Sequence, residues 1–144
     1  MRRFTLKRLA IGLFIATVLT GIPKAHADEN GELMQLIVNV PTLVMNGKAD
    51  EALPLGLRMV ALSEKLNGPE NPITANALGV LGDVYKARGQ VNEAEQAYKR
   101  AIAILQKADA GLAAVLLPAQ LEKLAVLYND HGRHRDAFEL LKQS

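Results

Sequence analysis

The chain has 144 residues, of which 49% are hydrophobic, 4% aromatic and 22% charged. This length suits one domain, and the composition excludes a disordered chain because enough apolar side chains are present to form a core. Cysteine is absent, which excludes disulfides, thiolate metal sites, cysteine nucleophiles and anchoring through a lipidated cysteine.

Residues 1–27 have the pattern of a secretory signal peptide. Four basic residues flank the start of an apolar run, LAIGLFIATVL, and Ala25-His26-Ala27 offers the small residues that signal peptidase requires. The run is shorter than the about 20 apolar residues of a spanning helix, and the alternative is an uncleaved membrane anchor. We therefore expect cleavage after Ala27, a periplasmic or secreted protein, and no membrane span in the mature chain.

The positive charge of the chain belongs to this export segment. The full chain has a net charge of +2, whereas Asp28–Ser144 keeps 12 basic and 15 acidic residues and carries −3. A nucleic-acid partner would require a basic patch on the folded domain, so none is expected.

A six-residue pattern, Gly-x-x-x-acid-Ala, occurs three times. Its glycines, Gly47, Gly89 and Gly132, are spaced 42 and then 43 residues apart. Each copy follows one stretch of helical periodicity and precedes another. The near-constant spacing indicates a repeated helical hairpin, because glycine tolerates the left-handed conformation that ends a helix in a tight turn.

The middle copy has the clearest helical pattern. Apolar residues recur at spacings of three and four in its first helix, and Gly82 lies where a second helix must approach closely. Asn92 is expected to cap the second helix, with Glu95 three residues later as its partner. The buried face of the second helix is expected to comprise Ala94, Tyr98, Ala101, Ile102 and Leu105.

These positions resemble the tetratricopeptide repeat. The signature places fall on Leu78, Leu81, Gly82, Tyr85, Ala94, Tyr98 and Ala101, and again on Leu121, Leu124, Ala125, Tyr128, Ala137 and Leu141. The long period and the Gly-Pro-Glu-Asn-Pro linker resemble the kinesin-light-chain type of this repeat. The resemblance implies an all-α fold, a right-handed stack of antiparallel helical hairpins. It would occupy residues 28–144, with units at about 33–66, 73–107 and 118–144.

The first unit departs from the signature. Asn39 and Gly56 stand where the repeat has large apolar residues, and Pro41 is expected to kink or shorten the first helix. Terminal repeats are often atypical, so this unit is interpreted as a capping repeat. Residues 109–118 depart from the linker pattern, because they are apolar and are expected to continue as helix or to pack on the core.

The resemblance also implies a binding surface. In the family, the first helix of each pair lines a concave face that holds extended peptides or partner helices. The family's carboxylate-clamp version is not expected, because Asp83 and Glu122 would repel an anion. The alternative for the first helix is burial by the preceding segment or by a dimer partner. The predicted partner-binding groove consists of Met34, Ile37, Val44, Asn76, Asp83, Lys86, Glu122 and Asn129.

The resemblance implies an exported module that binds another protein or peptide in this groove, as an adaptor, assembly or chaperone-like factor. The alternative is a structural or regulatory subunit that self-associates into a homo-oligomer. The last helix carries Phe138, Leu140 and Leu141 and is followed by no polar capping helix in this sequence, which would leave these side chains exposed.

No sequence pattern points to catalysis. The HExxH motif, the Gly-x-Ser-x-Gly elbow and a phosphate-binding loop are all absent from the sequence. His131 and His134 flank the third turn and are interpreted as solvated turn residues rather than metal ligands. We expect no enzyme activity, no cofactor and no metal.

Overall fold

The computed structural model describes residues 24–142, with side chains described from Asp28 onward, and over this range the protein is all-α. The described part comprises six helices and no strand. They are α1 (Lys24–Met45), α2 (Ala49–Asn67), α3 (Pro72–Ala87), α4 (Val91–Lys107), α5 (Ala110–Asp130) and α6 (His134–Leu141).

The predicted export segment falls almost wholly outside this range. Residues 1–23 are not described, and residues 24–27 form the first turn of α1. Contacts divide the chain into two units at Leu33, and the described part of the first unit, residues 24–32, is helical. Export and cleavage after Ala27 therefore remain predictions.

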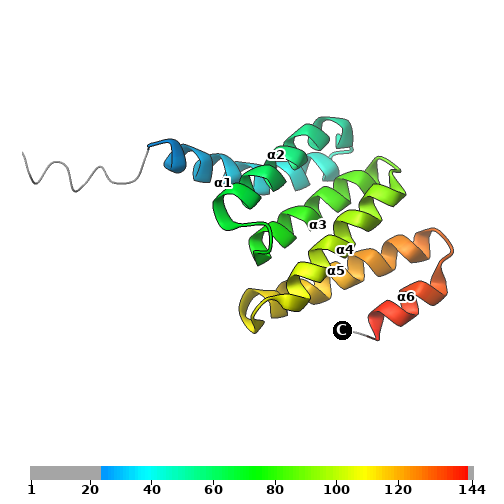
Figure 1. Cartoon of the computed structure of the whole chain (residues 1–144). Helices are drawn as coiled ribbons and strands as arrows, with labels where there is room; N and C mark the ends of the chain where they lie inside the picture. Colours follow the sequence, from blue (N-terminus) through cyan, green and yellow to red (C-terminus); the bar gives the residue numbers. More distant parts are fainter. Residues whose placement is uncertain (1–23, 143–144) are drawn as a thin grey trace, which may run out of the picture. The chain divides into compact units, whose positions relative to one another are not determined.

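Leu33–Ser144 forms the unit that contains the hairpins. Helix α3 pairs with α4 and α5 pairs with α6, while α2 packs on α3 and α4 packs on α5 (Figure 1). Each new hairpin therefore lies against the second helix of the preceding one. The predicted all-α fold of packed helical hairpins is confirmed.

The three glycines of the repeated pattern end helices in the same way. Gly47, Gly89 and Gly132 have φ of 72°, 72° and 73°, a region that a side chain disfavours. At each turn the glycine N–H donates to the carbonyl three residues back, and the next N–H donates to the carbonyl five residues back. The repeated sequence thus encodes one turn geometry three times.

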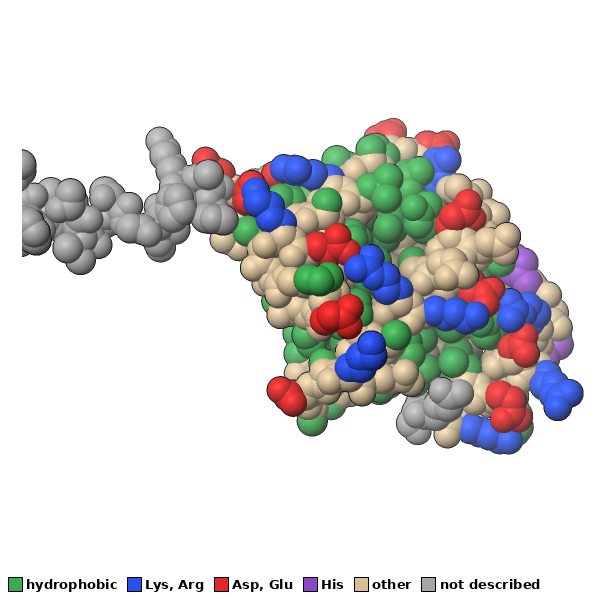
Figure 2. Space-filling model, viewed as in Figure 1, with side chains coloured by type: hydrophobic (Ala, Val, Ile, Leu, Met, Phe, Trp, Pro, Cys, Tyr) green, Lys and Arg blue, Asp and Glu red, His purple; other side chains and the backbone are tan. Residues whose placement is uncertain are grey.

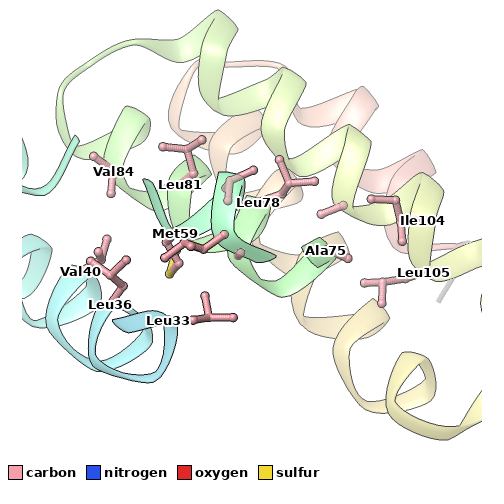
Figure 3. Packing of buried hydrophobic residues seen from close by; sticks show 14 of the residues in the cluster. Leu33, Leu36, Val40, Met59, Ala75, Leu78, Leu81, Val84, Ile104 and Leu105 are labelled. Carbon is pink, nitrogen blue, oxygen red and sulfur yellow. The ribbon is translucent and has the colours of Figure 1, made fainter. Parts of the chain in front are cut away.

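The first core cluster lies among α1, α2, α3 and α4 and includes Ala113 of α5. Leu36 and Val40 from α1 lie near Met59 from α2 and Leu81 from α3 (Figure 3). Gly56 of α2 is buried among them, and a Cβ there would lie 3.1 Å from Cδ1 of Leu81. A small residue at this position therefore allows α2 and α3 to approach closely.

A second core cluster joins α4, α5 and α6. Its buried residues include Tyr98 from α4, Leu124 and Tyr128 from α5, and Ala137 from α6. The predicted close approach of a second helix at Gly82 is confirmed here. A Cβ on Gly82 of α3 would lie 2.5 Å from Cε1 of Tyr98, so only glycine leaves room for the ring.

The first unit fits its interpretation as a cap in one respect and differs from the sequence prediction in another. Asn39 and Thr42 are exposed on α1, whereas Leu81 and Val84, at the matching places of α3, are buried. Polar residues on the outer face suit a terminal repeat, although Met34, Val38 and Met45 of α1 are also exposed. Of the two effects expected of Pro41, a kink or a shortened helix, the shortening is wrong, since α1 continues to Met45. Beside the proline, the Thr42 hydroxyl donates to the Val38 carbonyl at 2.8 Å.

Two local predictions concern helix starts. Residues 110–118 are helical, as expected, and Ala113, Leu116 and Leu117 pack on the first core. The predicted cap at Asn92 is wrong, because α4 already begins at Val91 with Gln90 as its cap residue. The Gln90 N–H donates to the Tyr85 carbonyl, and this turn hydrogen bond fixes the earlier start. Glu95 is therefore not needed as a capping partner and can bind other side chains.

A candidate interaction groove between α3 and α5

Some of the predicted groove positions of the second and third units line one hollow, whereas Asn76 and Asn129 are not among its lining residues. A hollow of about 310 Å³ is lined by Asp83 and Lys86 from α3, Tyr98 from α4, and residues of one face of α5. Three residues predicted from sequence, Asp83, Lys86 and Glu122, therefore line one surface. The α5 residues of this lining are Ala119, Glu122, Lys123 and Val126.

Asp83 is held by two neighbours. The Tyr98 hydroxyl donates to Oδ1 of Asp83 at 2.7 Å, and Nζ of Lys123 donates to Oδ2 at 2.6 Å. Burial raises the pKa of the Tyr98 hydroxyl, and the nearby Asp83 carboxylate raises it further. Both carboxylate oxygens are engaged, so Asp83 joins α3, α4 and α5 and is not a free recognition group.

Lys86 also has a partner within the chain. Its Nζ lies 2.9 Å from Oδ2 of Asp130, and this ion pair lowers the pKa of the Asp130 carboxyl. An anion clamp would need Lys86 to face the ligand with its charge uncompensated. The geometry therefore agrees with the expectation that this groove does not grip a carboxylate terminus.

Glu122 and Asn76 are the polar groups that remain available. Glu122 is exposed and Asn76 half-buried, and neither has a hydrogen bond or ion pair with any described residue. Asn129 is exposed, and its Oδ1 lies 3.1 Å from Nδ1 of His134. Glu122 is thus the one unpaired charge in the lining of the hollow.

The predicted residues of α1 do not line this hollow. Met34 is 65% exposed, whereas Ile37 and Val44 are half-buried and pack against the first core cluster. Met45, near the end of the same helix, is 87% exposed. Ile37 and Val44 instead hold α1 against its neighbours.

Sequence reasoning missed a charged cluster where α4, α5 and α6 meet. Oε1 of Glu95 accepts from the Tyr128 hydroxyl at 3.0 Å and from Lys99 at 2.6 Å, and Oε2 accepts from Arg133 at 2.7 Å. The Arg133 guanidinium also lies 4.0 Å from the centroid of the Tyr128 ring. The spacing of Glu95 and Lys99 was the available signal, but Tyr128 and Arg133 are distant in sequence.

This cluster strongly favours the charged form of Glu95. Burial, which leaves the side chain 13% exposed, acts to raise the pKa of Glu95, but hydrogen bonds from Lys99, Arg133 and Tyr128 lower it to about 2. The same carboxylate raises the pKa of Lys99. The pKa of Tyr128 is also raised, chiefly by burial and secondly by its hydrogen bond to Glu95. The cluster thus fastens the third unit to the second.

A larger hollow, of about 590 Å³, lies between two connections. Residues 67–72 of the α2–α3 connection form one wall, and the end of α4 with the start of α5 forms the other. Leu112, which is 50% exposed, belongs to this lining. This hollow was not predictable from local sequence patterns, because its two walls are distant in sequence and meet only in the packed structure.

The two histidines lie in the third turn, as expected. Nδ1 of His131 lies 2.8 Å from the Leu127 carbonyl oxygen, and both rings are exposed. Across the described residues, no three His, Asp or Glu side chains gather as a metal site would require.

Acidic and basic side chains are interspersed over the face of the molecule seen in Figure 2.

One described helix, α5, is long and apolar enough to cross a bilayer by length and composition. Of its most apolar 18 residues, 33% are buried inside the protein. Core helices of packed domains satisfy the same criterion, so this is weak evidence for a membrane span. Helix α5 here contributes Leu121, Leu124 and Leu127 to the second core. The more unusual property is the large exposed share of such an apolar helix.

Comparisons with known proteins agree with this architecture. The family model described as "Tetratricopeptide repeat" matches residues 42–107, and no curated protein matches the chain. The crystal structure of the TPR domain of Arabidopsis FLU has a TM-score of 0.67 and 20% sequence identity, covering 80% of this chain and 92% of that one. That identity establishes the shared fold alone. Residues 42–107 thus match the tetratricopeptide repeat model, and the chain shares the fold of a TPR domain.

Proposed function

We propose that this protein is an exported interaction module that holds a segment of a partner polypeptide in the groove between α3 and α5. Tetratricopeptide repeat domains generally mediate protein–protein interaction, which supports binding as the function class. The observation that carries the proposal is the hollow lined by groove positions of two successive units, with Glu122 unpaired in it. An adaptor, assembly or chaperone-like role follows from such binding, and no catalytic step is proposed.

Site-specific cross-linking in cells tests the groove. A photoreactive phenylalanine derivative at Val126, inside the hollow, should form an adduct with a partner polypeptide. The same derivative at Ala103, an exposed residue of α4 that does not line the hollow, is the matched control. Adducts at Ala103 without adducts at Val126 would exclude the groove as the binding surface.

Export is a separate part of the proposal. It is supported by the basic, apolar and small-residue succession in residues 1–27. Mass spectrometry of the protein recovered from the periplasm or the medium should give a chain that begins at Asp28. Recovery from membranes with residues 1–27 still attached would instead support the anchor.

Self-association through the last helix is the alternative function. Leu141 is 45% exposed and Phe138 is 61% exposed, whereas Tyr98, which matches Leu141 in the preceding unit, is fully buried by α5. Light scattering at tens of micromolar distinguishes the alternatives. A dimer that the double variant Phe138→Ser, Leu141→Ser converts to monomer would favour self-association, and a monomeric parent protein would exclude it.

The kinesin-light-chain type of the repeat stays our proposal for the subtype. It is supported by glycine spacings of 42 and 43 residues and by the linker at Gly68–Pro72. Helix α5 departs from that pattern, because it begins eight residues before Pro118.

A further inference from the structure

The solvent-facing side of α5 carries a regular stripe of residues. Its members recur at alternating spacings of three and four, which is the a and d pattern of a helix that packs along another helix. Leu112, Val115 and Val126 are 50%, 71% and 40% exposed, and the other two members are also exposed. The α5 stripe consists of Leu112, Val115, Ala119, Glu122 and Val126.

Packing within the described chain does not account for this stripe. Helix α5 uses a different face for the core, with Ala113, Leu121 and Leu124 buried. The stripe spans four helical turns, or about 21 Å at 1.5 Å per residue. It links the two hollows, since Leu112 lines the larger one and Val126 the smaller one. An exposed surface therefore extends along α5, beyond the positions predicted from sequence.

The charges around the stripe indicate what would cover it. Glu122 lies within the stripe and is unpaired, while the neighbouring Lys123 and Lys86 are already paired with Asp83 and Asp130. A cation for Glu122 must therefore come from outside the described chain. A second copy packed through the same stripe would bring a second Glu122 and no available base. An anionic membrane would repel both Glu122 and the −3 charge of Asp28–Ser144.

We propose that the α5 stripe docks one amphipathic helix of the partner, with apolar residues at heptad spacing and a lysine or arginine opposite Glu122. This inference rests on the proposed function and specifies the partner of the same groove. Apolar contacts with Leu112, Val115 and Val126 provide the area, and the Glu122 pair fixes the register.

Model peptides test the inference on the purified protein by fluorescence anisotropy. The probe is a fluorescein-labelled helical peptide of about 21 residues, with leucine or alanine at a and d positions and lysine at one central d position. A second peptide has glutamate in place of that lysine. Val115→Asp should weaken binding of the lysine peptide at least about tenfold, because it puts a carboxylate into an apolar contact. Ala103→Asp introduces the same charge on an exposed face of α4 and should change nothing.

Glu122→Lys provides the charge test. It should weaken the lysine peptide by about fivefold and strengthen the glutamate peptide, as expected for exchanging an attractive pair for a repulsive one. Failure of the lysine peptide to bind, or binding that neither variant alters, would overturn the inference. Binding to phosphatidylethanolamine–phosphatidylglycerol vesicles that Val115→Asp abolishes would replace it with membrane docking. If the groove binds a partner that is not an amphipathic helix, the peptide tests would fail while cross-linking at Val126 would still succeed. The two experiments therefore distinguish failure of this inference from failure of the proposed function.

Discussion

Gly82 and Tyr98 compete for the same space, and the absence of a side chain at one allows the other to be buried. A Cβ on Gly82 would lie 2.5 Å from Cε1 and 2.7 Å from Cδ1 of Tyr98, whose exposed fraction is 0%. The hydroxyl of the same tyrosine reaches Asp83, the residue next to Gly82. The distance between α3 and α4 and the position of a groove carboxylate are therefore fixed by one contact.

Gly82→Ala should destabilise the fold by about 1–3 kcal/mol, because the ring is enclosed and cannot move away cheaply. Urea unfolding measures the loss as a lower midpoint with an unchanged slope. Gly111→Ala is the matched control, since Gly111 lies in the first turn of α5 with nothing within 4 Å of a Cβ. The control should stabilise slightly through helix propensity, and an equal loss in both variants would refute the steric explanation.

Gly89→Ala should destabilise by about 1–2 kcal/mol for a different reason. Gly89 has φ of 72° with nothing within 4 Å of a Cβ, so the cost is conformational and not steric. Gly89→Asn should cost less than Gly89→Ala, because asparagine tolerates the left-handed region better. Thermal unfolding of both variants measures the difference. A lower melting temperature for Gly89→Asn than for Gly89→Ala would contradict the conformational explanation.

The Tyr98–Asp83 hydrogen bond should be measurable as a coupling. Tyr98→Phe and Asp83→Asn should each destabilise, and the double variant should lose less than the sum of the two by about 0.5–2 kcal/mol. Both substitutions keep the side-chain volume, so the coupling reports the hydrogen bond and not the packing. Strict additivity in urea unfolding would show that the charge of Asp83 adds nothing to this hydrogen bond.

The sequence predicted the hairpins well because their signals are local. A glycine that ends a helix and an apolar spacing of three and four both lie within a few residues of the structure they determine. The contact of Gly82 in α3 with α4 involves two helices, but it was still predictable from sequence. Where two helices approach closely, only a small residue such as glycine fits. The cap at Asn92 failed because Gln90, two residues earlier, is already fixed by a turn hydrogen bond.

Three of the eight predicted groove residues line one hollow, but their pairing could not be predicted. Asp83, Lys86 and Glu122 lie where the repeat pattern put them, around one hollow. Which of them is free depends on Lys123, 40 residues after Asp83, and on Asp130. Helical periodicity specifies the face on which a side chain lies, and only the packed structure specifies its partner.

Glu95 should make the stability of the protein depend on pH in the acid range. Its pKa is lowered from 4.5 to about 2 in the folded state, so the stabilisation is fully present above pH 4.5 and is lost as pH falls toward 2. Glu95→Gln should therefore cost about 2 kcal/mol near neutral pH, where charge-assisted hydrogen bonds are lost, and the two proteins should converge as the parent protonates. Urea midpoints at several pH values measure this difference. Glu93→Gln removes an exposed carboxylate from the same helix and should change stability by less than about 0.5 kcal/mol at neutral pH. A gap between the parent and Glu95→Gln that stays constant down to pH 3 would mean that the Glu95 cluster does not stabilise the fold through its charge.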